Sequence, residues 1–403
     1  MTWRRHNRLS KARHIEKLIS LYPESNVLNI RINQPLRKLH VMQNPVFKLN
    51  SKSLALATLC ALAGVAAPTA ALAQSVIAPS FTWYGRLDVA LESNNDGTQG
   101  RTQIQNFSSR IGFKGERGFN SDLTGIFQVE TGFAPDDTTQ SKTLASRNSY
   151  VGLKSQSIGT LIVGTHDMPL KSLEGTANQL WGEGEAMEVI IHGKGTRSTL
   201  GGAVFDNVHT RKTNMLMYTS PKFSNIVAKL AYAPDEGQTA TTNKAMYSAS
   251  VEYNDGMYNI GLATQTQDKF TATGGAMTGN KLTAGMKMGA ISVGAAFSTL
   301  DNNSGKKTDN WLLTGSYAMG PVVFKANYGQ SSESASNADD GLSMAAIEVD
   351  YALDKMVTVY GYYATIDNKS KAKGTFAGAD NFPATAKAGD KPNALGLGMR
   401  FNF

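Results

Sequence analysis

From Phe81 to the C-terminus, apolar and polar residues alternate in segments of about ten residues that are rich in Tyr, Phe, Val, Thr and Gly. A side-chain period of two is typical of β-strands with one apolar and one polar face. No segment keeps the 3.6-residue period of an amphipathic helix over many turns. The alternation predicts an all-β chain with sixteen strands, at 81–91, 108–117, 122–133, 147–156, 159–166, 213–220, 226–234, 244–254, 257–267, 280–288, 290–299, 309–319, 321–332, 342–353, 355–367 and 393–403.

The last predicted strand shows how residues divide between the two faces. Leu397, Met399 and Phe401 share one face, whereas Gly398 and Arg400 share the other. A soluble β-sandwich would alternate in the same way, with its apolar face turned inward. Strand length and loop lengths are needed to separate the two folds.

The connections between the predicted strands alternate in length. Short turns contain Gly, Asn, Asp or Pro, whereas the long connections are polar. Short turns on one rim and long loops on the other are typical of outer-membrane barrels. The long connections are predicted at 92–107, 134–146, 167–212, 235–243, 268–279, 300–308, 333–341 and 368–392.

A secretory signal precedes the alternating region. After Met42, Lys48 and Lys52 form a positive segment, 54–67 is uncharged and rich in Ala and Leu, and 71–73 reads Ala-Leu-Ala. This order is the three-part signal-peptide pattern. We therefore expect a signal peptide at 42–73 and a mature chain at 74–403. Residues 1–41 fit no part of the pattern, and we interpret them as an over-extended N-terminus.

The basic balance of the chain belongs to this leader. The sequence has 40 Lys and Arg against 32 Asp and Glu, a formal charge of +8. Residues 1–73 hold 11 basic and two acidic residues, which leaves 29 basic and 30 acidic residues in 74–403. The mature chain is near neutral, so we expect no nucleic-acid partner. The single cysteine, Cys60, excludes an internal disulfide framework.

Together these features predict a sixteen-stranded antiparallel transmembrane β-barrel. The secretory signal, the strand length and the two classes of loop favour it over a sandwich. Closure satisfies every backbone polar group in lipid, which an open sheet cannot do. A barrel of 16 to 18 strands is also wide enough for an aqueous channel.

Several motifs in order along the chain resemble the general trimeric porins of Gram-negative bacteria, in their beta-proteobacterial branch. The matching stretches are 83–88, 109–115, 126–133, 147–153, 159–164, 211–214, 218–221 and 396–403. The resemblance implies an outer-membrane homotrimer, a water-filled channel for passive diffusion of ions and small hydrophilic solutes, and no cofactor or metal. It also implies contact with outer-membrane lipid and lipopolysaccharide. The terminal strand, with Phe401 and Phe403, resembles the signal read by the outer-membrane assembly machinery.

In such porins a long third loop folds into the lumen, and its acidic residues face basic residues of the wall. The field between opposite charges in a narrow pore sets ion preference. The resemblance assigns Glu183 and Glu185 to the acidic loop. It assigns Arg86, Arg110, Lys114, Arg147 and Arg211 to the basic wall, and Glu116, Glu130 and Arg400 to the lumen wall. Each could instead be a solvated charge or a salt bridge that fixes the loop. The arginines favour anions and the acidic loop opposes them, so we expect a weak anion preference.

Two other functions use the same barrel. One is a substrate-specific channel, although no clear aromatic track along the lumen is evident. The other is an outer-membrane enzyme, which needs a nucleophile and a base. After residue 73 the only histidines are His166, His192 and His209, and there is no Gly-x-Ser-x-Gly or His-x-x-x-His motif. We expect a channel without enzymatic activity.

Overall fold

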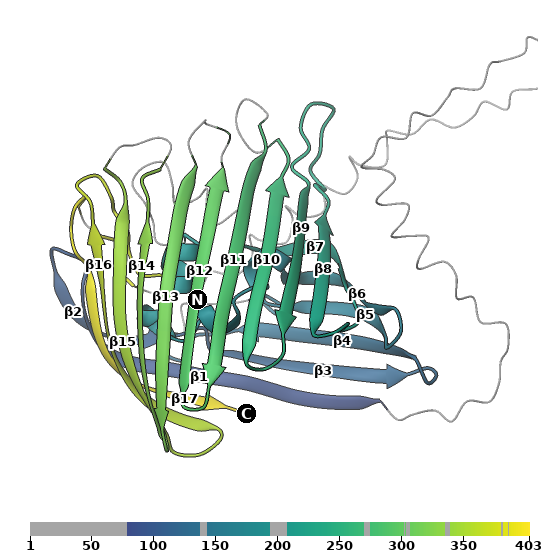
Figure 1. Ribbon diagram of the computed structural model, residues 1–403, viewed down its shortest axis with the longest axis horizontal. Coiled ribbons are helices and arrows are strands. Elements are labelled where there is room, and N and C mark those ends of the chain that lie inside the picture. The colour runs from purple at the N-terminus through teal and green to yellow at the C-terminus, as the bar shows by residue number, and fades with distance from the viewer. Residues whose placement is uncertain are drawn as a thin grey trace, which may run out of the picture. The chain divides into compact units, whose positions relative to one another are not determined.

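The computed structural model describes residues 79–403 except 138–142, 194–207, 270–274, 302, 304–306, 335–338, 380–381 and 386; the predicted signal peptide 42–73 and residues 1–41 lie outside the described residues. The strands form one antiparallel sheet that closes on itself, because the first strand pairs with the last (Figure 1). The strands are β1 (Ser80–Asn95), β2 (Gly100–Asn106), β3 (Arg110–Gly118), β4 (Leu123–Gly132), β5 (Ser149–Ser155), β6 (Gly159–Asp167), β7 (Arg211–Thr219), β8 (Ile226–Ala233), β9 (Met246–Asn254), β10 (Tyr258–Gln267), β11 (Met277–Met288), β12 (Ile291–Asp301), β13 (Thr308–Met319), β14 (Val322–Ser331), β15 (Leu342–Ala352), β16 (Val357–Asn368) and β17 (Asn393–Asn402).

The seventeen strands of the sheet occupy sixteen positions around the barrel, as predicted. Strands β2 and β3 both pair with the long β1, which meets β3 over 80–86 and β2 over 89–95. They are therefore two halves of one membrane-spanning strand, interrupted at 107–109.

The prediction of a long loop at 92–107 is wrong. Strand β1 continues to Asn95 and β2 begins at Gly100, which leaves only a turn at 96–99. The inner face of this hairpin is polar: Asn94 Nδ2 donates to Glu92 Oε1 at 2.7 Å, and Gln105 Nε2 donates to the same oxygen at 3.1 Å. A strand pair with such an inner face has a loop-like composition, and this misled the sequence interpretation.

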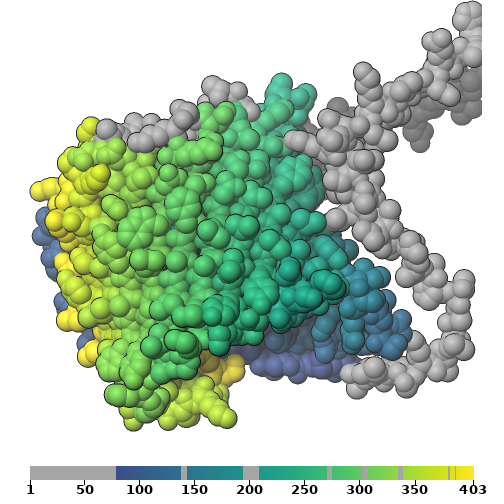
Figure 2. Space-filling view, in the orientation of Figure 1, coloured from purple at the N-terminus to yellow at the C-terminus, as the bar shows by residue number. Residues whose placement is uncertain are grey.

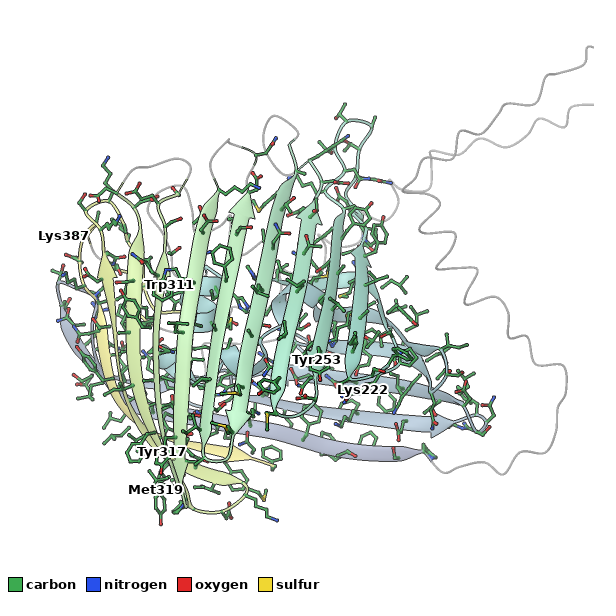
Figure 3. The ribbon with its side chains drawn as sticks, in the orientation of Figure 1. Lys222, Tyr253, Trp311, Tyr317, Met319 and Lys387 are labelled. Carbon is green, nitrogen blue, oxygen red and sulfur yellow. The ribbon has the colours of Figure 1, made fainter. Side chains whose placement is uncertain are left out.

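The outer face of the barrel is apolar. Leu397 is 71% exposed and Trp83 is 59% exposed, whereas Asp88 and Glu92 on the opposite face are fully buried. Figure 2 shows the outer surface of the β8–β16 wall as a continuous layer of side chains. On β13, Trp311 and Tyr317 lie toward opposite ends of the strand (Figure 3). Apolar side chains outside and polar side chains inside are the arrangement that a barrel in lipid requires.

Short turns join the strands at one rim. Strands β11 and β12 are joined by two residues, of which Gly289 has a φ of +58°, and Gly320 has a φ of +59° at the corresponding place between β13 and β14. Positive φ at the first turn residue matches the twist of tight hairpins, and glycine adopts it without strain. The longer connections lie at the other rim (Figure 1).

The barrel closes through close contacts of glycine with aromatic rings. Gly85 and Phe403 exchange both backbone hydrogen bonds, at 2.9 and 3.1 Å. On the inner face Gly398 lies opposite Tyr360 in the register of β16 and β17, and a Cβ at Gly398 would come within 2.3 Å of that ring. The glycines of the terminal strand therefore provide room for the tyrosines.

All helical segments of the described residues lie between β6 and β7. They are α2 (Pro169–Ser172), the 3₁₀ turns η1 (Gly175–Ala177) and η2 (Gly182–Gly184), and the π-helical turn η3 (Met187–Ile191). Figure 1 shows them behind the front wall of strands. None of the helices described here has the length and apolar character needed to cross a membrane.

Candidate functional site

The described part of the connection from β6 to β7, residues 168–193 and 208–210, is called loop 3 below. A cluster of polar side chains fixes its two ends. Arg211 at the start of β7 contacts Asp167 at the end of β6, with Nη2 and Oδ2 3.1 Å apart. Asn148 bonds both: its Oδ1 accepts from Arg211 Nε at 2.8 Å and its Nδ2 donates to Asp167 Oδ2 at 3.1 Å. Arg211 therefore holds the base of loop 3, which is the alternative role considered from the sequence.

Loop 3 crosses the inner face of the barrel and bonds to polar side chains of the opposite wall. Trp181 N donates to Glu348 Oε2 at 3.2 Å, and Asn327 Nδ2 donates to Gly184 O at 2.8 Å. Ser298 Oγ donates to Ile191 O at 3.0 Å. Three more backbone groups of loop 3 bond to side chains of β9, β10 and β11: Leu170 N with Ser248, Thr176 N with Asn259 and Lys171 O with Lys281.

Apolar packing adds to these bonds. Leu180, Ile190 and Ile191 are fully buried in one cluster with wall residues of β1, β12, β13 and β15–β17. Gly294 of β12 provides clearance, because a Cβ there would lie 2.2 Å from Thr176 O. Burial of each large aliphatic side chain contributes about 1.5–3 kcal/mol, so this packing holds loop 3 firmly.

Arg86 contacts the tip of loop 3 from the wall, and Arg110 lies beside it. Arg86 of β1 and Arg110 of β3 are direct neighbours in the register of the two strands. The Arg86 guanidinium lies 4.6 Å from the centroid of the Trp181 ring, a cation–π contact, and its Nε donates to Asn402 Oδ1 at 2.9 Å. Among the described residues neither arginine has a carboxylate oxygen within 4.0 Å. Like charges that face each other across strands repel, so this pair maintains a positive potential inside the barrel.

The other predicted basic residues differ in their surroundings. Arg147 Nε lies 2.6 Å from Glu130 Oε1, and Arg400 Nε lies 2.7 Å from Asp88 Oδ2. Their charges are therefore compensated. Lys114 is exposed and its Nζ lies 5.6 Å from the Tyr84 ring centroid. Glu116, on the same face of β3 as Lys114, is also exposed.

The predicted acidic residues of loop 3 are buried. Glu183 is fully buried and its Oε2 accepts from Gly378 N at 3.2 Å, within the connection between β16 and β17. Glu185 is 8% exposed and accepts from Asn178 Nδ2 at 2.9 Å. Burial raises the pKa of Glu183 well above its usual range and the pKa of Glu185 to about 8. The shifts favour the neutral form of both carboxyl groups, and Glu185 is mainly protonated at neutral pH, so the loop places less negative charge opposite the arginines than its sequence suggests.

Several residues of this site were missed from the sequence. Lys325 of β14 lies 2.7 Å from Glu348 and 2.7 Å from Asp350, both on β15. Tyr360 donates to Asp88 Oδ1 at 2.6 Å. All of these residues lie at inward positions, which alternate with outward positions along each strand. This alternation is the sequence signal that could have identified them.

Another group of side chains could attract a cation. Glu174, Glu188 and His192 each place one potential ligand atom within 4.8 Å of the others. Lys171 Nζ, however, already lies 2.9 Å from Glu188 Oε1. This carboxylate oxygen is therefore already paired with an ammonium group.

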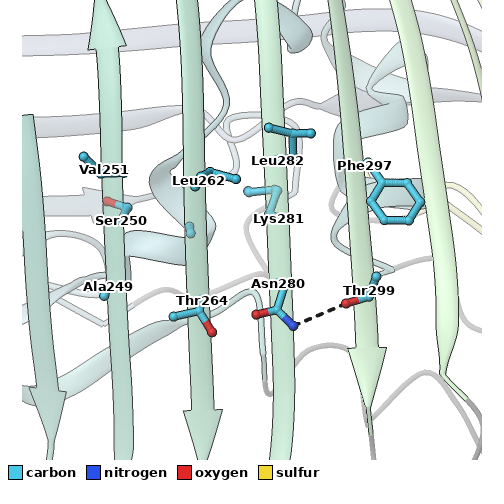
Figure 4. Close-up of a pocket in the computed structure, with 11 residues that line it drawn as sticks. Ala249, Ser250, Val251, Leu262, Thr264, Asn280, Lys281, Leu282, Phe297 and Thr299 are labelled. Carbon is cyan, nitrogen blue, oxygen red and sulfur yellow. Dashed lines mark hydrogen bonds between the residues drawn. The ribbon is translucent and has the colours of Figure 1, made fainter. Parts of the chain in front are cut away.

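A hollow of about 440 Å³ lies outside the lumen. Most of its lining side chains are outward ones of β9–β12, including Val251, Leu262 and Leu282, and Asn280 Nδ2 donates to Thr299 Oγ1 at 3.3 Å across its floor (Figure 4). Its lining surface is mostly apolar, and most of its side chains face away from the channel. It therefore belongs to the lipid-facing surface.

Comparison with known proteins identifies the family. The profile described as "Gram-negative porin" matches residues 55–371. The chain belongs to the Gram-negative porins. It is 27% identical to outer membrane porin protein 32 of Delftia acidovorans, over 86% of this chain and 99% of that one. It is 28% identical to the major outer membrane protein P.IB of Neisseria lactamica, over 63% of this chain and 68% of that one.

Solved structures agree on the fold of this porin. The anion-selective porin from Comamonas acidovorans aligns with a TM-score of 0.67 and 19% identity, over 81% of this chain and all of that one. Salmonella typhi OmpF aligns with a TM-score of 0.57 and 16% identity, over 80% and 97% of the two chains. The predicted sixteen-stranded barrel, outer-membrane location and diffusion channel are confirmed.

Proposed function

We propose that this porin is a general diffusion channel with a weak preference for anions, and that its narrowest part lies between loop 3 and the β1–β3 wall. The observation that carries the proposal is the pair of neighbouring arginines, Arg86 at the tip of loop 3 and Arg110 beside it, neither of which has a carboxylate partner in the described part of the chain. Fixed guanidinium groups in a water-filled pore concentrate anions and repel cations. Lys114, on the same face of β3, adds a third positive charge.

Loop 3 supports this direction of selectivity. The sequence suggested that Glu183 and Glu185 would oppose the arginines. Their burial and their raised pKa favour the neutral carboxyl groups and so reduce that negative charge. A similar fold is described as an anion-selective porin, but the preference is proposed here from the residues of this chain.

The assembly and partners are also proposals. A homotrimer is expected for the family. The rings of Phe81, Trp83, Phe113 and Phe127 cluster on the outer face of β1, β3 and β4, with neighbouring centroids 5.3–6.3 Å apart, and such a patch suits a subunit contact or lipid. Lipopolysaccharide would contact the rim of long loops. The assembly machinery would recognise the terminal strand with Phe401 and Phe403.

We infer a general channel rather than a substrate-specific one, and a channel rather than an enzyme. The adjoining rings of Phe107, Tyr362 and Tyr360 on the described inner face are buried, so they do not offer a sugar an exposed aromatic track. Planar-bilayer recording and liposome swelling test this directly. Conductance proportional to salt concentration, and swelling rates that fall with solute size alone, support the general channel. Saturation or block by one solute would favour the specific channel instead.

A further inference from the structure

The connection between β16 and β17 reaches the interior of the barrel at residues 375–379, which are called the capping segment. Phe376 is 4% exposed and belongs to the apolar cluster that also contains Leu180 of loop 3 and Tyr362 of β16. Its ring meets that of Phe382, from the same connection, with centroids 4.8 Å apart and an interplanar angle of 72°. The capping segment is therefore packed inside the barrel rather than exposed at the rim.

Polar bonds fix the start of the capping segment to the end of β16. Asn368 Nδ2 donates to Gly374 O at 3.0 Å, and Gly374 N donates back to Asn368 Oδ1 at 2.7 Å. Thr385 Oγ1 also donates to Gly374 O, at 2.6 Å, and Thr375 Oγ1 donates to Pro383 O at 3.1 Å. These bonds lie within the connection itself, so the segment has its own support beside its contact with loop 3.

The capping segment covers the side chain of Glu183 in loop 3. Gly378 N donates to Glu183 Oε2 at 3.2 Å, and Glu183 is fully buried. The two backbones touch here, because a Cβ at Gly378 would overlap the carbonyl oxygen of Gly182. Glycine permits this close approach of one backbone to another. Glu183 Oε1 has no hydrogen-bond partner among the described residues.

The position of Glu183 makes its cover relevant to the channel. Glu183 follows Trp181 by two residues, and Trp181 contacts Arg86. Burial, and next the carboxyl group of Glu92 on β1, raise the pKa of Glu183 well above its usual range. A carboxyl group in contact with water at this point of loop 3 would ionise and weaken the positive field of the neighbouring arginines.

We propose that the capping segment is a determinant of ion selectivity, because it covers Glu183 and keeps this carboxyl group out of the water-filled pore. The effect on selectivity rests on the proposed function, since the carboxyl group acts on passing ions only where the pore is narrow. Loop 3 supplies the glutamate and the β16–β17 connection shields it. Two connections far apart in the sequence therefore act together on the field of Arg86 and Arg110.

Thiol labelling tests the cover over Glu183 without reference to conductance. The one cysteine of the chain, Cys60, lies in the predicted signal peptide, so Glu183→Cys gives the predicted mature chain a single thiol. A neutral, water-soluble methanethiosulfonate reagent is applied to the purified porin. Adding Gly378→Ala should raise the labelling rate at least about fivefold, the smaller effect expected for one extra methyl group in a packed contact. The matched control is Gly237→Ala, at an exposed site where an added Cβ would lie 3.5 Å from Asp235 Oδ1, and it should leave the rate unchanged.

Selectivity is measured separately, as the reversal potential in a potassium chloride gradient. Gly378→Ala should shift this potential toward cation preference, since the uncovered Glu183 adds negative charge beside the arginines. Adding Glu183→Gln to Gly378→Ala should restore the wild-type value, because glutamine has a similar shape and no charge. If Gly378→Ala forms no channels, Phe376→Ala replaces it in both experiments, since it removes the apolar anchor of the same segment.

The two measurements separate the possible failures. An unchanged labelling rate would overturn the cover over Glu183. A shift of the reversal potential that Glu183→Gln does not restore would overturn the role of this carboxyl group. Faster labelling without any shift would overturn the role in selectivity together with the proposed position of the narrowest part of the channel.

Discussion

The guanidinium of Arg86 lies over the indole ring of Trp181, 4.6 Å from its centroid. This contact joins the β1 wall to the tip of loop 3 across the interior of the barrel. The same tip is also bonded to β15, where Trp181 N donates to Glu348 Oε2 at 3.2 Å. The position of loop 3 in the channel therefore depends on contacts with both strands.

Replacing Trp181 with Ala should widen the channel. The substitution removes the cation–π contact, which contributes about 0.5–2 kcal/mol, and it removes the bulk of the ring. We expect a larger single-channel conductance and faster swelling of liposomes with large solutes. Trp311→Ala on the outer face is the matched control and should leave both unchanged (Figure 3). Equal conductance of Trp181→Ala and the wild type would place the narrowest part elsewhere.

Replacing Lys325 with Met should destabilise the barrel strongly. Lys325 is 11% exposed and lies 2.7 Å from both Glu348 and Asp350, so its loss leaves two buried carboxylates without their nearest cation. Removing one partner of a buried ion pair lowers the free energy of unfolding by about 3–5 kcal/mol. A urea titration followed by tryptophan fluorescence measures the free energy of unfolding. Adding Glu348→Gln should restore part of the loss; no recovery in the double variant would argue against a charge effect.

The barrel was predictable because lipid imposes a simple alternation on every strand. Leu397 and Met399 had to face outward once Gly398 and Arg400 faced inward, and the structure has this order. The wrong prediction of a long loop at 92–107 has the same origin. A strand with Glu92 and Asn94 inside and few apolar residues outside gives a weak alternation, so its pairing with β2 was not visible.

Glu185→Gln should change how stability depends on pH. Burial raises the pKa of Glu185 to about 8. A carboxyl group with a raised pKa stabilises the docked loop fully below its free value of about 4.3 and loses that contribution as the pH rises toward 8. The variant should therefore match the wild type at pH 4 and exceed it at pH 9. The difference should grow by at most about 1.4 kcal/mol per pH unit. A constant difference in urea titrations across this range would contradict the raised pKa.

The candidate site was only partly predictable. Arg86 and Arg110 could be selected from their motif positions, and strand register then made them neighbours. The burial of Glu183 could not be predicted, because it depends on Gly378 of a distant connection. The wall residues that donate hydrogen bonds to loop 3, such as Ser298 and Asn327, are ordinary polar residues in the sequence. Their role depends on where the loop lies.

The most direct test of the central claim is the reversal potential in a potassium chloride gradient. The wild type and the double variant Arg86→Ala/Arg110→Ala are compared in planar bilayers at neutral pH. Lys222→Ala, in a short turn at the opposite rim, removes a positive charge far from loop 3 and is the control (Figure 3). The wild type and Lys222→Ala should show the same weak anion preference, and the double variant should lose or reverse it. An unchanged reversal potential in the double variant would contradict the claim that these two arginines set the selectivity of the channel.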